Sequence, residues 1–131
     1  MKLDLPLPKI NDPESYRNQI EQVLISVREQ IEETYPDRLS LLITTSSSNS
    51  QPDEKVLTYS IYLVFNRRHG FSYRLFELKC VQTDGGLPVE VNAFSAPTKP
   101  FGIAVTIEEL NKKIEEIFAH PRTREIILAN Y

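Results

Sequence analysis

The sequence contains no tryptophan, one cysteine, two histidines and four glycines among its 131 residues. A single cysteine, Cys80, excludes an internal disulfide, and its place in an apolar stretch indicates a buried thiol in a reducing compartment. Four glycines leave no glycine-rich loop for phosphate. His69 and His120 have no partner at the spacing of zinc ligands. We therefore expect neither a metal nor a cofactor.

An excess of positive charge and a long apolar run are also missing. The formal net charge is −3, whereas proteins that bind nucleic acid usually carry a basic excess, so we expect another kind of partner. No segment approaches the roughly 20 apolar residues that cross a bilayer. Residues 1–9 lack the apolar centre of a secretory signal. These absences predict a cytoplasmic protein without a membrane partner.

The sequence does contain enough apolar material for one core. Hydrophobic residues make up 40% and charged residues 25%, which is typical of a globular domain. The length fits a single domain over 1–131. Residues 1–11 alternate leucine with proline and charge, so we expect them to form an extended arm.

Apolar spacing and breaker residues predict the order of the elements. A first helix begins at Asp12-Pro13 and ends at Tyr35-Pro36. Strands are predicted at 38–46, 55–66, 71–82 and 88–94, and the serine-rich segment 46–54 is predicted to be a loop.

Two more helices follow the strands. Thr106 and Glu109 form a capping box that begins the first of them, and His120-Pro121 separates it from a short last helix. The order α-β-β-β-β-α-α predicts an α+β fold, in which a four-stranded antiparallel sheet carries the helices on one face.

The register of the central hairpin decides which side chains face the helices. Leu57 to Phe65 and Phe76 to Cys80 alternate apolar with polar residues, and the apolar sets share a face if Asn66 pairs with Phe71. With Gly85-Gly86 as the next turn, Lys79 is expected between Thr58 and Asn92. The opposite face then carries Thr58, Ser60, Tyr62, Tyr73, Leu75, Glu77, Lys79, Glu90 and Asn92.

This second face and the nearby hairpin tip are the candidate binding surface. Tyrosine and arginine carry much of the binding energy at protein interfaces. We therefore predict a non-enzymatic module that binds a protein partner. The residues expected to contact that partner are Tyr62, Arg67, Arg68, Tyr73, Glu77 and Lys79. The simpler alternative is a solvated face without a role, as antiparallel sheets often have.

An enzymatic alternative comes from Glu77-x-Lys79 with Pro52-Asp53 upstream. This arrangement resembles the signature of restriction-like metal-dependent nucleases. The resemblance implies that Asp53 and Glu77 hold a divalent cation and that Lys79 orients the attacking water. However, the expected register separates Asp53 from Glu77 by about 23 Å along the strand, too far for a shared metal.

Three further possibilities stay open. The segment FNRRHGFSYR, residues 65–74, is the most basic of the chain, and its aromatic side chains could stack on nucleic-acid bases. A hairpin turn over Arg67–Gly70 explains the same residues more simply.

An exposed edge strand at 38–46 or 88–94 could pair with a second copy. A ligand pocket between sheet and helices has no sign in the sequence.

Overall fold

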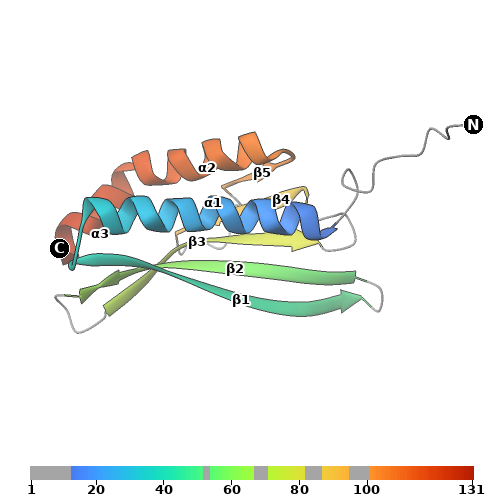
Figure 1. Ribbon diagram of the computed structural model, residues 1–131, viewed down its shortest axis with the longest axis horizontal. Coiled ribbons are helices and arrows are strands. Elements are labelled where there is room, and N and C mark those ends of the chain that lie inside the picture. The colour runs from blue at the N-terminus through green and yellow to red at the C-terminus, as the bar shows by residue number, and fades with distance from the viewer. Residues whose placement is uncertain (1–12, 52–53, 67–70, 82–86, 95–100) are drawn as a thin grey trace, which may run out of the picture.

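The computed structural model describes residues 13–51, 54–66, 71–81, 87–94 and 101–131. The elements are α1 (Pro13–Thr34), β1 (Leu39–Gln51), β2 (Glu54–Phe65), β3 (Phe71–Val81), β4 (Val89–Ala93), β5 (Gly102–Ala104), α2 (Ile107–Ala119) and α3 (Pro121–Asn130). The strands form one antiparallel sheet in the order β1-β2-β3-β4-β5, and the helices lie on one side of it (Figure 1). The predicted α+β class is confirmed, with five strands in place of four. The expected arm at 1–11 lies outside the described residues.

Each long helix buries the stripe that its sequence predicts. In α1 the buried residues are Ile20, Leu24 and Ile31, and in α2 they are Leu110, Ile114 and Ile117. They pack on the inward side chains of the strands, so the core lies between the sheet and the helices. No helix in the described part of the chain is long and apolar enough to cross a membrane.

The ends of α2 follow the predicted capping signals. The Thr106 hydroxyl accepts a hydrogen bond from the Glu109 backbone N–H at 3.1 Å, which satisfies one free donor of the first turn. His120 lies between α2 and α3, where its Nδ1 accepts from the Arg122 backbone N–H at 3.1 Å. His120 therefore has a structural role at a helix junction.

The serine-rich segment is part of strand β1 and not the predicted loop. Pairing runs from Leu39↔Phe65 to Ser48↔Val56 and Asn49↔Lys55, so most of the segment 46–54 is built into the β1–β2 hairpin. Its serines have weak intrinsic preferences, and the long, apolar partner strand β2 supplies the pairing that decides the structure. Sequence propensity alone was misleading here.

A β-bulge changes the predicted register of β2 and β3. From Val56 to Ile61 the expected pairing is confirmed, but beyond Ile61↔Phe76 the next pair is Tyr62↔Arg74. Leu75 is the extra residue, and both Leu75 and Phe76 are fully buried. The bulge moves Tyr73 opposite Leu63, onto the helix-covered face. The expectation that Tyr73 and Leu75 belong to the second face is therefore wrong.

The far edge of the sheet also differs from the expectation. β4 pairs with β3 through Glu77↔Asn92 and Lys79↔Glu90, two residues from the register that a Gly85-Gly86 turn predicts. The shift keeps the same residues on each face. β5 then pairs with β4, so segment 88–94 is not an edge strand, whereas β1 is one.

Candidate functional site

The face of the sheet opposite the helices is the predicted binding surface. We call it the open face and define it by the residues that the strand pairing places there: Ser40, Leu42, Thr44, Ser46, Ser48, Val56, Thr58, Ser60, Tyr62, Val64, Ser72, Arg74, Glu77, Lys79, Val81, Glu90, Asn92 and Ile103. The three described helices lie on the other face of the sheet, where their residues form part of the core or pack against it.

Glu77 lies at the centre of this face in a small network of polar side chains. Its carboxylate oxygens are 3.6 Å from Arg74 Nη1 and 3.9 Å from Lys79 Nζ. Asn92 Nδ2 donates to Glu77 Oε1 at 3.5 Å. The Glu77 side chain is only 18% exposed, whereas those of Arg74 and Lys79 are 44% and 46% exposed. The network holds two cations at the surface around one partly covered carboxylate.

An apolar area adjoins the network. Tyr62 lies in a row across the sheet between Leu42 on β1 and Arg74 on β3. Leu42, the fourth of the 13 residues of β1, is 47% exposed. Together these three residues offer an aliphatic side chain, an aromatic ring and a guanidinium side by side. Such a combination is typical of protein-binding surfaces.

The structure brings together only part of the predicted site. Tyr62, Glu77 and Lys79 share the open face, as expected. Tyr73 faces the helices, where its hydroxyl is buried without a hydrogen-bond partner among the described residues. Arg67 and Arg68 lie outside the described residues.

The sequence prediction missed Leu42 and Arg74. Leu42 stands in the apolar run Leu41-Leu42-Ile43, in which all three residues are apolar and do not themselves show which one points outward. Arg74 reaches the open face only because of the bulge at Leu75. No local pattern in FSYRLFELKC predicts that bulge. The adjacent apolar pair Leu75-Phe76 is compatible with one.

The arrangement required by a metal-dependent nuclease is not seen in the described residues. Glu77 pairs with Ser60, whereas β2 begins at Glu54, about 20 Å away along the strand. Asp53 itself lies outside the described residues. Where the chain is described, no three histidine, cysteine, aspartate or glutamate side chains gather as metal ligands. The Glu77 carboxylate instead lies 3.6 Å from Arg74 Nη1 and 3.9 Å from Lys79 Nζ.

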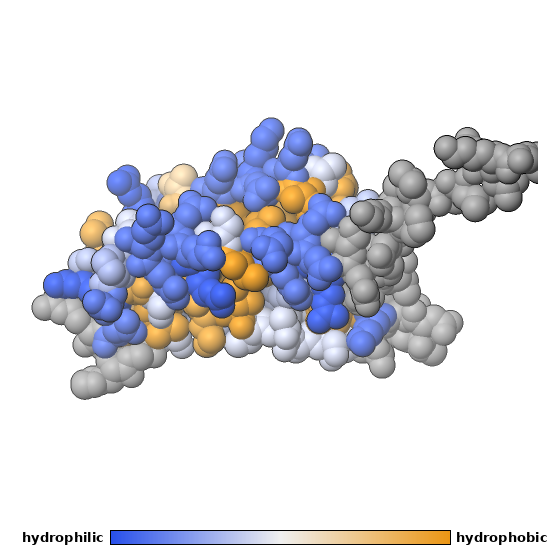
Figure 2. All heavy atoms as spheres, viewed as in Figure 1, coloured by the Kyte–Doolittle hydropathy of each residue, from blue (hydrophilic) through white to orange (hydrophobic). Residues whose placement is uncertain are grey.

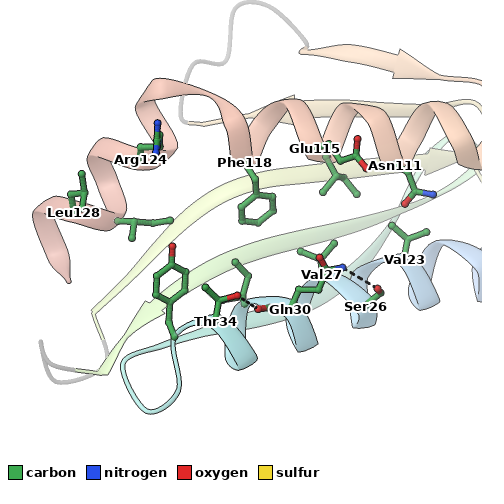
Figure 3. Close-up of a pocket in the computed structure, with 14 residues that line it drawn as sticks. Val23, Ser26, Val27, Gln30, Thr34, Asn111, Glu115, Phe118, Arg124 and Leu128 are labelled. Atoms are coloured by element: carbon green, nitrogen blue, oxygen red, sulfur yellow. Dashed lines mark hydrogen bonds between the residues drawn. The ribbon is translucent and has the colours of Figure 1, made fainter.

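A second feature is a groove in the helical layer, between α1 on one side and α2 and α3 on the other (Figure 3). Its volume is about 510 Å³. Val27 and Phe118 point into it from opposite helices, and Ser26, Gln30 and Asn111 lie along its margins. Figure 2 shows this apolar strip between the hydrophilic surfaces of the helices. The groove can hold an apolar group with polar contacts at its margin.

Two groups with shifted pKa values belong to the core and not to a catalytic site. Burial raises the pKa of the Cys80 thiol from 9.0 to about 12. Burial and a hydrogen bond to Glu21 raise the pKa of Tyr59, whose hydroxyl donates to Glu21 Oε1 at 3.0 Å. Both groups stay protonated near neutral pH, so neither offers a nucleophile or a general base.

Comparison with known proteins adds no functional assignment. No protein-family model matches the chain, and no curated protein and no solved structure matches it.

Proposed function

We propose that the chain is a small non-enzymatic interaction module that binds a protein partner through the open face. Leu42, Tyr62 and Arg74 form the centre of the contact, and Glu77 and Lys79 extend it. The proposal keeps Tyr62, Glu77 and Lys79 from the sequence prediction, omits Tyr73, and adds Leu42 and Arg74.

The observation that carries the proposal is the fixed network around Glu77 beside an exposed leucine and a tyrosine. Tyr62 and Arg74 are residue types that are enriched at protein interfaces, and Leu42, which is 47% exposed, adds apolar area beside them. The ion pairs with Glu77 restrict the Arg74 and Lys79 side chains before a partner binds. These two side chains therefore lose less conformational entropy on binding.

The charges also indicate what kind of partner fits. Arg74 and Lys79 are far more exposed than Glu77, so their cationic groups lie outermost in this network, and Glu90 lies opposite Lys79 on the next strand. An acidic side chain on the partner would meet the Arg74 guanidinium, with an apolar residue against Leu42 and Tyr62. We infer a partner surface that combines carboxylate and apolar groups.

Replacement of Tyr62 and Arg74 together by alanine is expected to weaken partner binding by at least about tenfold, because both are typical hot-spot residue types. Affinity capture from a lysate of the source organism, quantified by mass spectrometry, measures the loss. The matched control is Gln30→Ala/Thr34→Ala, which removes polar groups from the groove and leaves the open face unchanged.

The proposal requires one protein that the wild type and the groove control retain and the open-face variant loses. Equal retention by all three proteins contradicts it, and so does a loss confined to the groove control. Circular dichroism must show that each variant is folded. Tyr73 is left unchanged because its ring packs against the core, so its loss would weaken the fold itself.

The groove supports a second candidate function, the binding of a small apolar molecule. Its volume of about 510 Å³ is within the range of small-molecule sites, roughly 300–1,000 Å³. Val23, Val27, Ile114 and Phe118 supply an apolar lining, and Gln30 and Asn111 supply polar contacts. This site is on the opposite side of the molecule from the open face, so the two candidates are separable.

The dye 1-anilinonaphthalene-8-sulfonate is the probe for this groove. We expect its fluorescence to rise and shift to the blue with the wild type, and the affinity to fall at least about tenfold in Val27→Glu, which places a negative charge in the groove against the sulfonate of the dye. The Tyr62→Ala/Arg74→Ala protein should bind the dye as the wild type does. Unchanged binding by a folded Val27→Glu protein would contradict the second candidate.

A further inference from the structure

Strand β1 forms an unusually unprotected edge of the sheet. Its 13 residues, LSLLITTSSSNSQ, include no charged residue and no proline. Natural edge strands are normally short, charged or bulged, since a free edge pairs readily with another strand. The pairing of β1 with β2 is irregular only at the end of the strand, between Asn49 and Gln51. The opposite edge, β5, has three residues, and the Lys113 side chain lies against its Gly102. Among the described residues, no strand pairs with the outer edge of β1, whereas β5 is short and lies against a lysine side chain.

The backbone groups that face outward can be assigned from one hydrogen bond. The Asn66 N–H donates to the Arg38 carbonyl at 3.0 Å, so position 38 points its polar groups toward β2. In an antiparallel ladder this direction alternates, so Leu41, Ile43 and Thr45 point theirs toward the free edge, whereas the Leu39 N–H already donates to the Tyr35 carbonyl at 3.2 Å. Leu41, Ile43 and Thr45 can form a second ladder with an added strand.

The residues on the two sides of Leu42 are chemically similar, so this part of β1 can pair with an identical antiparallel strand. Ser40 and Thr44 flank Leu42 on the open face, and Leu41 and Ile43 flank it on the helix side. An antiparallel copy centred on Leu42 would place Leu42 against Leu42, Leu41 against Ile43, and Ser40 against Thr44. Figure 2 shows the apolar first half of β1 below α1, next to its paler serine and threonine half.

Helix α1 carries an independent self-complementary pattern on its side toward this edge. The residues on this strip recur every three or four positions and are Arg17, Glu21, Ile25, Arg28 and Glu32. The strip lies away from the groove, and Arg17 borders a shallow hollow with Thr45 and Ser47 of β1. In an antiparallel copy, Arg17 would meet Glu32, and Glu21 would meet Arg28, with Ile25 near the centre.

The centres of the two patterns lie close together. Glu21 accepts a hydrogen bond from Tyr59, which pairs with Thr45, so position 21 of α1 lies near position 45 of β1. The midpoint of the α1 strip, between residues 24 and 25, is about 5 Å farther along the helix, or one to two strand residues. That distance brings it close to Ile43, next to Leu42.

We propose that a second copy of this chain docks across the free edge of β1. The two β1 strands pair antiparallel about a two-fold axis at Leu42, and the two α1 helices run antiparallel above them. The result is one sheet formed from two five-stranded halves, with all helices on the same side. The two open faces become continuous, so the dimer is compatible with the proposed function but does not depend on it.

Sedimentation of the purified chain at about 10 μM tests the dimer first. We expect a species of twice the 15.1 kDa chain mass. A chain that stays monomeric at every accessible concentration overturns the proposal. This holds even if a strand from another protein is found to pair with the β1 edge.

Charge reversal on α1 tests the orientation of the two copies. Arg17→Glu and Glu32→Arg each place like charges opposite one another, so each alone should weaken the dimer by about tenfold. An equimolar mixture of the two variants restores both Arg–Glu pairs and should form a heterodimer of wild-type affinity. Both positions are exposed. Because Arg17→Glu also removes the ion pair with Glu21, circular dichroism must show that each variant is folded. No preference for the mixed dimer overturns the helix arrangement.

A disulfide locates the axis on β1. In the proposed register the two copies of residue 42 have Cα atoms about 4.5 Å apart, within the range that a disulfide bridges. Leu42→Cys should therefore oxidise to a covalent dimer, while the native Cys80 is buried and stays out of the reaction. Ser46→Cys is the control, because its copies lie about 26 Å apart. Cross-linking through Ser46→Cys in preference to Leu42→Cys overturns the register.

Discussion

Replacement of Leu75 by lysine is expected to destabilise the protein by at least about 3 kcal/mol. Leu75 is the extra residue of the β3 bulge, and its side chain is fully buried. The change removes its packing, which for a leucine contributes about 2–5 kcal/mol, and it introduces a charge into the core. Urea unfolding followed by circular dichroism measures the change in the free energy of unfolding.

The same substitution at Ser72 provides the control for the bulge. Ser72 is exposed on the open face of the same strand, so Ser72→Lys should change the stability by no more than about 0.5 kcal/mol. Leu75→Ala, with an expected loss of about 2–5 kcal/mol, replaces the lysine variant if that protein does not fold. A Leu75→Lys protein as stable as the wild type would mean that β3 has no bulge and that Leu75 lies on the open face.

The second large effect is a loss of stability in alkaline solution that depends on Cys80. Burial raises the pKa of its thiol from 9.0 to about 12 in the folded protein. The unfolded chain therefore releases this proton first. The contribution of the protonated Cys80 thiol to the free energy of unfolding is complete below pH 9. Between pH 9 and 12 this contribution is lost, by about 1.4 kcal/mol for each pH unit.

Cys80→Ala isolates this contribution from the other groups that titrate at high pH. Between pH 9 and 10 the wild type should lose about 1 kcal/mol more of its free energy of unfolding than the variant does. Above pH 10 the raised pKa of Tyr59 adds a loss of the same sign to both proteins. Equal pH dependence of the two proteins would contradict the burial of the thiol.

The elements that the sequence predicted well are those with strong local signals. The capping box at Thr106 and Glu109 fixes the start of α2, and the apolar spacing of Ile20, Leu24 and Ile31 fixes the buried side of α1. Alternation also placed Ile61 and Phe76 in the correct pair. Each of these signals depends on a few neighbouring residues.

The features that the sequence did not predict depend on pairing between distant segments. Serines 46–48 are in a strand because β2 pairs with them, and β5 exists because Ile103 and Ala104 pair with β4. The bulge at Leu75 results from the packing of two adjacent apolar side chains in one core, which a strict two-residue alternation cannot express. That single inserted residue exchanged Tyr73 for Arg74 in the candidate site.

Photo-cross-linking from the open face tests the proposed function most directly. A benzophenone amino acid in place of Tyr62 would react with whatever contacts the centre of that face in cells of the source organism. The matched control carries the same group at Gln30, on the margin of the groove. The proposal predicts one discrete adduct with a protein from position 62, which disappears when Arg74 is changed to glutamate. An adduct from position 30 and none from position 62 would contradict it and would place the partner on the helical side.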